Sequence, residues 1–424
     1  MASTLLTISV AILVGLLMSR LGKLLKLPAV TAYLVTGVLI GPFCLGALNI
    51  DGLGFHSDLQ IASLGILSEV ALGFIAFAIG NEFRLSQLKK TGKQATVIGI
   101  VQAVVATLLV DVVLIGFHYL FPEHLSLSAA ITLGAIASAT APAATLMVVR
   151  QYKAKGPLTD LLLPIVALDD AVGLIIFSVS FGVARALQTG SPDIISIVVE
   201  PTVEIIASLA LGSVMSLVLT FFEKFFHSRS KRLSLALCFV LLTVGISIMN
   251  FEIGPITLSF SPLLTCMMLG TVFCNLCDFS EELMDRCDRW TAPLFILFFV
   301  ISGAELKLSV FADTIIVLIG IIFIVTRSIG KYLGAYFSAK AVHCDKNTTR
   351  YLGITLLPQA GVALGMSVTA MQLGQTDGGL IRNIVLFAVL IYELIGPLLT
   401  KLSLSAAGEI KHHEMVSARG GKVH

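Results

Sequence analysis

Long apolar segments separated by short polar loops constrain the fold of this chain more than any other feature. Only 13% of the 424 residues are charged, which is about half the share in a typical soluble domain. A helix that crosses a bilayer needs about 20 mainly apolar residues, and the sequence offers such segments many times. It predicts an all-α membrane protein with 13 transmembrane helices. These are expected at 4–19, 29–48, 61–80, 95–117, 128–149, 158–186, 203–225, 234–249, 257–275, 291–304, 312–340, 350–373 and 379–401.

The basic residues of the loops support this number of helices, because cytoplasmic loops carry an excess of Lys and Arg. When the loops are taken alternately, one set, together with the C-terminal segment, holds 23 basic residues. The other set holds only Arg185, Lys307 and Arg382. A single miscounted helix would destroy so uneven a split. The sequence therefore predicts an N-out, C-in orientation, with a membrane transporter domain over 1–405 and a disordered cytoplasmic tail over 406–424.

Two of the predicted spans contain helix-breaking residues at matching positions. Pro142 interrupts Ala135–Thr145, and Pro358 and Gly361 interrupt Leu356–Gly365. A helix broken by proline survives in hydrocarbon only where protein or a wet cavity satisfies the freed backbone groups. The breaks are seven spans apart, so the two helices enter from opposite sides, as in an inverted repeat with a site between broken helices. Ordinary proline kinks are the alternative for either break alone.

Two acidic residues in one apolar segment and two basic residues in another carry charge at positions expected within the membrane. Asp169 and Asp170 are flanked on both sides by apolar helix, where an ionised carboxylate costs several kcal/mol unless it is paired, solvated or neutralised. Adjacent residues differ by about 100° around a helix, so one acid can be paired while the other is open to ions. Lys331 and Arg327 are one turn apart in the eleventh span. Lys331 can instead snorkel to the interface, and Arg327 can hold helices together as a permanent charge.

Other polar residues within the spans are weaker candidates. Thr140, beside the first break, offers oxygen to a hard cation, or alternatively bonds back to its own helix. Glu69, Asp111 and Glu393 are deep by the predicted boundaries. They are expected to be structural, hydrogen-bonded or lining a water path.

The remaining features predict neither a cofactor nor an enzyme. Cys274 and Cys277 form a lone CxxC without a second pair or a nearby His, so inert thiols are expected. No resident metal cluster, nucleophile constellation or nucleic-acid contact is predicted. The segment Phe279–Trp290 mixes charges and apolar residues at helical spacing. It is expected to be an interfacial helix linking two halves.

Six motifs follow one another along the chain: Leu27–Pro42, Ser138–Pro142, Ala167–Asp170, Ile301–Leu306, Gly330–Gly334 and Leu357–Gly365. Through these motifs the sequence resembles the monovalent cation:proton antiporter-2 family over most of its length. The resemblance implies a homodimer in which a dimerisation scaffold packs against a mobile core, formed by helices at 95–186 and 312–401, with two crossed unwound helices. Related potassium-efflux members carry a C-terminal nucleotide-binding domain, and gating by such a domain is not expected here.

The resemblance also implies roles for individual residues. Asp170 is expected to be the principal carrier of cation and proton, and Asp169 is expected to pair with Lys331. A lysine beside the double aspartate is similar to the electrogenic members, whereas electroneutral relatives tend to carry arginine there. Arg327, one turn away, is a second possible partner of Asp169. Gln359 stands where some relatives carry a charged residue, a position that bears on the choice of ion.

These features together predict a secondary antiporter in the bacterial inner membrane. It would exchange Na⁺, or alternatively Li⁺ or K⁺, for protons by elevator-like alternating access. The main rival predictions are a K⁺ efflux channel or transporter and a sodium-coupled symporter of organic solutes. A transport-inactive membrane sensor is a further alternative.

Overall fold

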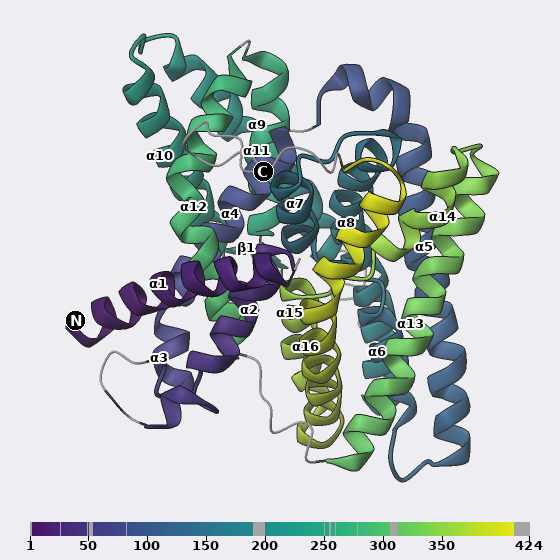
Figure 1. Ribbon diagram of the computed structural model, residues 1–424. Coiled ribbons are helices and arrows are strands. Elements are labelled where there is room, and N and C mark those ends of the chain that lie inside the picture. Colours follow the sequence, from purple (N-terminus) through teal and green to yellow (C-terminus); the bar gives the residue numbers. More distant parts are fainter. Residues whose placement is uncertain are drawn as a thin grey trace.

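The computed structural model describes residues 2–25, 27–48, 50, 54–81, 83–189, 200–249, 251–253, 256–258, 260–277, 279–305 and 313–410 (Figure 1). The side chains of a few of these residues, including Asp170, lie outside the description. In chain order the elements are α1 (Ala2–Leu24), α2 (Ala29–Ile40), the 3₁₀ helix η1 (Leu45–Leu48), α3 (Asp58–Ser63), α4 (Gly65–Asn81), α5 (Leu85–Leu120), α6 (Leu127–Ile136), α7 (Pro142–Gln151), α8 (Pro157–Thr189), α9 (Glu200–Glu223), α10 (Arg229–Ile248), β1 (Phe251–Ile253), β2 (Ile256–Leu258), α11 (Pro262–Leu276), α12 (Ser280–Glu305), α13 (Thr314–Ala341), α14 (Lys346–Thr355), α15 (Gly361–Thr369), the 3₁₀ helix η4 (Ala370–Leu373) and α16 (Gln375–Ala406).

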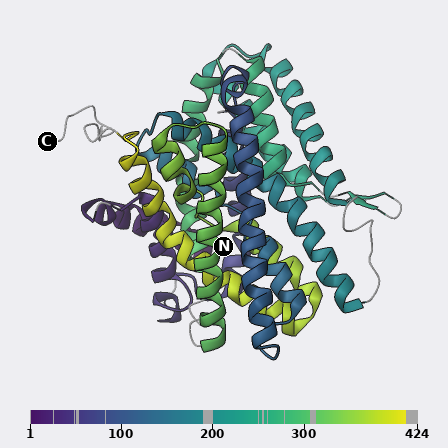
Figure 2. The same ribbon diagram turned by 90° about the vertical axis from the view of Figure 1, so that its right-hand side faces the viewer.

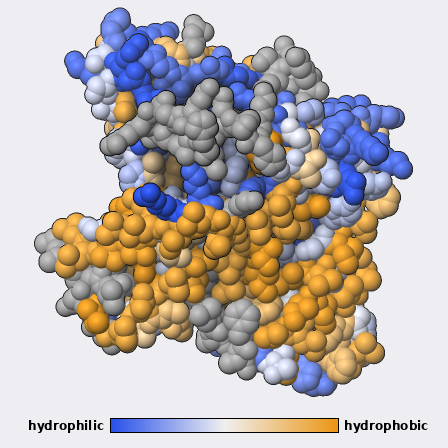
Figure 3. All heavy atoms as spheres, in the orientation of Figure 1, coloured by the Kyte–Doolittle hydropathy of each residue, from blue (hydrophilic) through white to orange (hydrophobic). Residues whose placement is uncertain are grey.

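The surface and the helix lengths are those of a membrane protein. Nine helices among the described residues are long and apolar enough to cross a bilayer. Figure 3 shows a broad apolar surface that includes α1, while hydrophilic side chains gather along the upper edge of the same view. The chain is thus an all-helical membrane protein, apart from the antiparallel pair of short strands β1 and β2.

Every predicted span overlaps a described helix, with two differences. The predicted interfacial helix Phe279–Trp290 is wrong as a separate element, because α12 runs without interruption from Ser280 to Glu305 and contains Pro293. The ninth predicted span begins too early. Residues 256–258 form β2, and α11 starts at Pro262, where Ser261 caps the helix by accepting a hydrogen bond from the backbone N–H of Leu264. The total of thirteen spans stays a prediction, and α1 runs across the direction of α12 in Figure 1.

Two groups of helices have the same internal pattern. In each group a long helix is followed by a broken helix and then by a long helix that contains a proline. The first group consists of α5, the broken helix α6–α7, and α8 with Pro164. The second consists of α13, the broken helix α14–α15, and α16 with Pro397. The groups meet where α5 and α13 lie side by side (Figure 2). A Cβ atom on Gly330 would come within 2.8 Å of the Cα atom of Ala106, so only glycine permits this approach.

The chain folds back after α16 and joins the start of α8. The Glu409 side chain accepts hydrogen bonds from the backbone N–H groups of Leu158, at 2.6 Å, and Thr159, at 2.9 Å. A carboxylate there satisfies N–H groups that a helix N-terminus leaves free. The tail predicted from residue 406 is therefore part of the packed domain over 407–410, and residues 411–424 lie outside the described part.

Candidate functional site

The two predicted helix breaks are present, and they meet each other. The first lies between α6, which ends at Ile136, and α7, which begins at Pro142. The second lies between α14 and α15, over residues 356–360. The backbone N–H of Ala141 donates to the carbonyl oxygen of Pro358 at 2.8 Å. Four helix ends therefore converge: the negative ends of α6 and α14 and the positive ends of α7 and α15.

Arg327 satisfies the carbonyl groups that the breaks set free. Its guanidinium group donates to the carbonyl oxygens of Ala137 at 3.0 Å, Ala139 at 2.6 Å and Leu357 at 2.8 Å. It also lies 4.5 Å from the centre of the Tyr392 ring. The side chain is fully buried. It thus joins both breaks through hydrogen bonds to these carbonyls.

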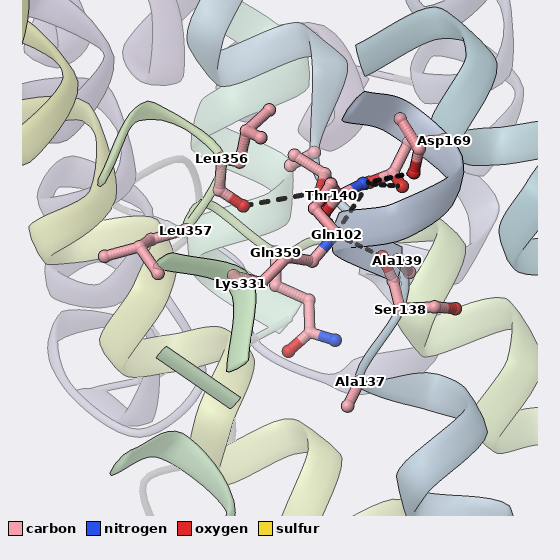
Figure 4. Close-up of polar contacts among 12 residues, drawn as sticks. Gln102, Ala137, Ser138, Ala139, Thr140, Asp169, Lys331, Leu356, Leu357 and Gln359 are labelled. Atoms are coloured by element: carbon pink, nitrogen blue, oxygen red, sulfur yellow. Dashed lines mark hydrogen bonds and ion pairs between the residues drawn. The ribbon is translucent and has the colours of Figure 1, made fainter. Parts of the chain in front are cut away.

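Lys331 lies one turn further along α13 and forms an ion pair with Asp169. Its Nζ atom is 2.8 Å from the Oδ2 atom of Asp169, and neither side chain is exposed. The ammonium also donates to the Oγ1 atom of Thr140 at 2.8 Å and to the carbonyl oxygen of Ser138. Figure 4 shows Nζ between Thr140 and Asp169. The ammonium therefore links the ion-pair partner in α8 to the first helix break.

Asp169 has a second, uncharged partner. The amide Nε2 atom of Gln102, in α5, donates to Oδ1 of Asp169 at 2.5 Å and to the carbonyl oxygen of Gly99 at 2.9 Å. A Cβ atom on Gly334 would come within 2.7 Å of the Cα atom of Gln102, so the close approach of α13 to α5 places Gln102 and Lys331 beside the same carboxylate. The sequence prediction missed Gln102, because one amide in an apolar helix forms no pattern.

Thr140 and Gln359 both lie at the helix breaks, but they form different hydrogen bonds. The Thr140 hydroxyl donates to the carbonyl oxygen of Leu356 at 3.3 Å, so it bonds across to the other break rather than back to its own helix. The Gln359 amide donates to the carbonyl oxygen of Ile136 at 2.9 Å, and its buried Oε1 atom has no hydrogen-bond partner. In Figure 4 its side chain points away from the ion pair. Gln359 therefore joins the breaks without contacting Asp169 or Lys331.

The other sequence candidates lie away from the ion pair. Glu69 has an exposed side chain near the start of α4, and its depth within the membrane stays a prediction. Glu393 is buried in α16, and its Oε2 atom has no hydrogen-bond partner. Glu305, at the end of α12, interacts electrostatically with both acids. Asp170 follows Asp169 in α8, but its side chain lies outside the described part of the structure.

A cavity of about 850 Å³ opens beside the first half of α8. It reaches Leu163 and Pro164 in α8, between the helix start and Asp169. Across it, the Nη1 atom of Arg150 in α7 lies 2.5 Å from the Oδ1 atom of Asp288 in α12. Charged side chains of both signs line the cavity: Arg84, Arg150, Lys153, Lys155, Asp160, Glu281, Asp285 and Asp288.

The arrangement suits charge exchange. A carboxylate and an ammonium are held in contact away from solvent, beside backbone segments whose carbonyls and helix ends carry partial charges. Such a pair can be opened by a competing cation or by movement of a proton, because a lysine can lose its proton when buried. Within the described residues no group of three or more His, Cys, Asp or Glu side chains is placed to hold a metal ion.

Comparisons with known proteins find similarity to sodium/hydrogen exchangers and Na⁺/H⁺ antiporters. The model of the transmembrane sodium/hydrogen exchanger family matches residues 8–405. The chain is 23% identical to the Na⁺/H⁺ antiporter NhaS4 of Synechocystis sp. over 416 residues, or 95% of this chain and 96% of that protein. It is also 23% identical to the Na⁺/H⁺ antiporter 1 of Methanocaldococcus jannaschii over 338 residues, or 77% of this chain and 75% of that one.

Solved structures show the same fold. The sodium proton antiporter MjNhaP1 from Methanocaldococcus jannaschii at pH 8 is similar with a TM-score of 0.62 and 21% identity. An electron-microscopy structure of the same antiporter gives a TM-score of 0.70 and 18% identity. Each comparison covers 95% of both chains.

Proposed function

The chain belongs to the transmembrane sodium/hydrogen exchanger family, and we propose that it is a secondary antiporter that exchanges Na⁺ for protons. The buried ion pair between Asp169 and Lys331 at the meeting point of two broken helices is the observation that carries this proposal. The names of the two relatives, both Na⁺/H⁺ antiporters, support the choice of ions. The predicted relationship to the cation:proton antiporters is confirmed at the level of the superfamily, whereas the narrower assignment to the cation:proton antiporter-2 family is not, since the matching model is that of the sodium/hydrogen exchangers.

We assign the transported ions to Asp170, with Asp169 and Lys331 as a pair that opens and closes beside it. A sodium ion that reaches Asp170 displaces a proton from that carboxyl group. The positive charge of the ion also weakens the contact between Asp169 and Lys331, and Lys331 then releases its proton. Thr140 accepts a hydrogen bond from Lys331 in the closed pair, so its hydroxyl becomes free for another contact when the pair opens.

Arg327 has a different role because arginine keeps its charge in proteins. Its hydrogen bonds to the carbonyls at both breaks hold the unwound segments together in every state of the cycle. A fixed positive charge there offsets the negative ends of α6 and α14. Lys331 can therefore change its protonation without the breaks coming apart.

Access to the site is proposed to alternate by movement of a core against a scaffold. The core comprises the two matched groups α5–α8 and α13–α16, and the remaining helices form a scaffold through which two copies dimerise. The cavity beside α8 would be the cytoplasmic entrance, since basic loop residues such as Arg84 and Lys153 surround it. The orientation that we propose has the N-terminus outside and the C-terminus in the cytoplasm, in the inner membrane of a bacterium.

The presence of a lysine in the pair favours electrogenic exchange, with more than one proton per sodium ion. Li⁺ and K⁺ are the alternative cations. A K⁺ efflux channel would conduct at rates beyond any conformational cycle. A sodium-coupled symporter needs a pocket for an organic solute, whereas the residues around Asp169 and Lys331 are closely packed and buried.

Purified protein in liposomes tests the proposal. With a pH gradient across the membrane, we expect addition of NaCl to dissipate the gradient with saturable dependence on Na⁺, more strongly than LiCl or KCl. Choline chloride is the control for osmotic effects. Absence of a response to all three salts would contradict exchange, and flux that never saturates would indicate a channel.

A further inference from the structure

Gln102 is the buried partner of Asp169 that the mechanism has not yet used. Its side chain is fully buried, and its amide reaches one oxygen of Asp169 while Lys331 reaches the other. The carboxylate thus has one partner that can lose its charge and one that cannot. The two contacts come from different helices, α5 and α13, which pack against each other.

We propose that Gln102 is a positioning residue. It holds Asp169 in place, and keeps it ionised, when Lys331 has released its proton and no longer pairs with Asp169. This inference rests on the proposed exchange of Na⁺ for protons. In the proton-loaded state Lys331 balances the charge of Asp169, so Gln102 adds little. In the cation-loaded state Lys331 has released its proton, and the amide donor of Gln102 remains. Gln102 therefore favours the cation-loaded state over the proton-loaded state.

The amide is suited to this task in two respects. It does not titrate, so its contact with Asp169 persists across the working range of pH. Its Oε1 atom is buried without a hydrogen-bond partner. Because an amide carries a donor and an acceptor, the same side chain can turn and accept a hydrogen bond if Asp169 becomes protonated.

Few charged groups compete with the contact between Gln102 and Asp169. The described residues of the two breaks add only hydroxyl, amide and backbone groups, and Tyr392 of α16 faces Arg327 rather than Asp169. On α5, α8 and α13 the fully buried charged side chains that the structure describes are Asp169 in α8 and Lys331 and Arg327 in α13, while Asp111 in α5 lies beside Gly134.

Gln102→Met tests the proposal, since methionine keeps the length of the side chain and removes the donor. Loss of a hydrogen bond to a charged group is expected to raise the Na⁺ concentration for half-maximal exchange about tenfold. The pH of half-maximal exchange should move up by about one unit, because Lys331 then has to balance Asp169 alone. The maximal rate at saturating Na⁺ and high pH should change less than either value.

Gln94→Met is the matched control. Gln94 also lies on α5, and its amide donates to the carbonyl oxygen of Val342, just past the end of α13, at 3.1 Å, far from Asp169. It should leave the Na⁺ dependence and the pH profile as in the parent. Gln102→Asn, a smaller change, should move both values in the same direction as Gln102→Met.

Thermal unfolding in detergent, with NaCl compared to choline chloride, gives a second reading that needs no transport. Na⁺ should raise the melting temperature of Gln102→Met and Gln102→Asn less than that of the parent or Gln94→Met, since a bound ligand stabilises according to its affinity. The proposal fails if both Gln102 variants match Gln94→Met in Na⁺ dependence, pH profile and Na⁺-induced stabilisation. If the parent itself exchanges no Na⁺, the proposed function fails instead, and this inference with it.

Discussion

The Nζ atom of Lys331 lies 2.8 Å from the Oδ2 atom of Asp169, and both side chains are fully buried. Breaking such a contact from one side leaves a buried charge without its partner, which is strongly destabilising. In the proposed mechanism, a cation at the neighbouring residue, Asp170, relieves that cost. The pair is therefore suited to open only when a cation arrives, which couples the two ions.

Lys331→Gln should remove the charge that moves with the proton. Reconstituted parent protein is expected to produce a net current when Na⁺ is applied, because more than one proton crosses for each sodium ion. The variant should produce no current, either because exchange has become electroneutral or because it has stopped. Currents on supported membranes measure this, with Lys340→Gln, at an exposed residue of the same helix, as the control. An unchanged current per sodium ion transported would remove Lys331 from the mechanism.

Arg327→Lys should destabilise the protein while the charge is retained. A lysine cannot reproduce the guanidinium contacts to Ala137, Ala139 and Leu357, so buried carbonyls at the breaks lose their donors. The expected loss is about 1.5–3 kcal/mol of folding stability, the range for a hydrogen bond to a charged group. Thermal unfolding in detergent measures it. Arg350→Lys, at an exposed residue, is the control, and equal stability of the two variants would argue against this role for Arg327.

The ion pair between Arg150 and Asp288 should favour the arrangement described here, in which the cavity beside α8 is open. Arg150→Gln should reduce the rate at which a thiol reagent labels a cysteine placed at Leu163, on the cavity wall. A partly exposed pair contributes about 0.2–1 kcal/mol, so a change of roughly 1.5-fold to fivefold is expected. The double exchange Arg150→Asp with Asp288→Arg should restore the rate. Equal labelling in all variants would mean that the ion pair does not influence movement of the core.

Asp345, outside the membrane-spanning helices, should make the folding stability depend on pH in the acidic range. Its carboxylate accepts from the backbone N–H groups of Asn347 and Thr348, each at 3.0 Å, and so caps α14. Partial burial acts to raise the pKa of Asp345, but the hydrogen bonds from Thr348 and Asn347 outweigh it and hold the pKa below the usual 3.8. A lowered pKa gives stability that is present above about pH 4 and is lost as the pH falls further.

Asp345→Ala should therefore lower stability by about 1 kcal/mol at pH 7, the usual loss for a helix cap. The difference from the parent should shrink as the pH falls below 4, because the parent then loses its carboxylate. Asp345→Asn keeps an oxygen for the cap and should lie between the two at pH 7. Unfolding at several pH values in detergent measures this, and a difference that does not vary with pH would assign no role to the charge.

The sequence predicted most of the helices and both breaks, because long apolar runs and prolines within them act locally. It also pointed to Asp169 and Lys331, since charges in such runs need a partner. It did not find Gln102, whose importance depends on the contact of α5 with α13. Nor did it find the contact of Glu409 with the start of α8, which joins residues about 250 positions apart. The wrong division of α12 arose because charges near Trp290 suggested an interface, whereas the helix continues through them.

Exchange by Asp170→Asn tests the central claim most directly. In liposomes with an acidic interior, the parent is expected to take up radioactive Na⁺ against its concentration gradient. Asp170→Asn, which keeps the size of the side chain but can carry neither a proton nor a charge, should show no uptake above empty liposomes. Uptake by the variant at the rate of the parent, with the same dependence on the pH gradient, would contradict the account.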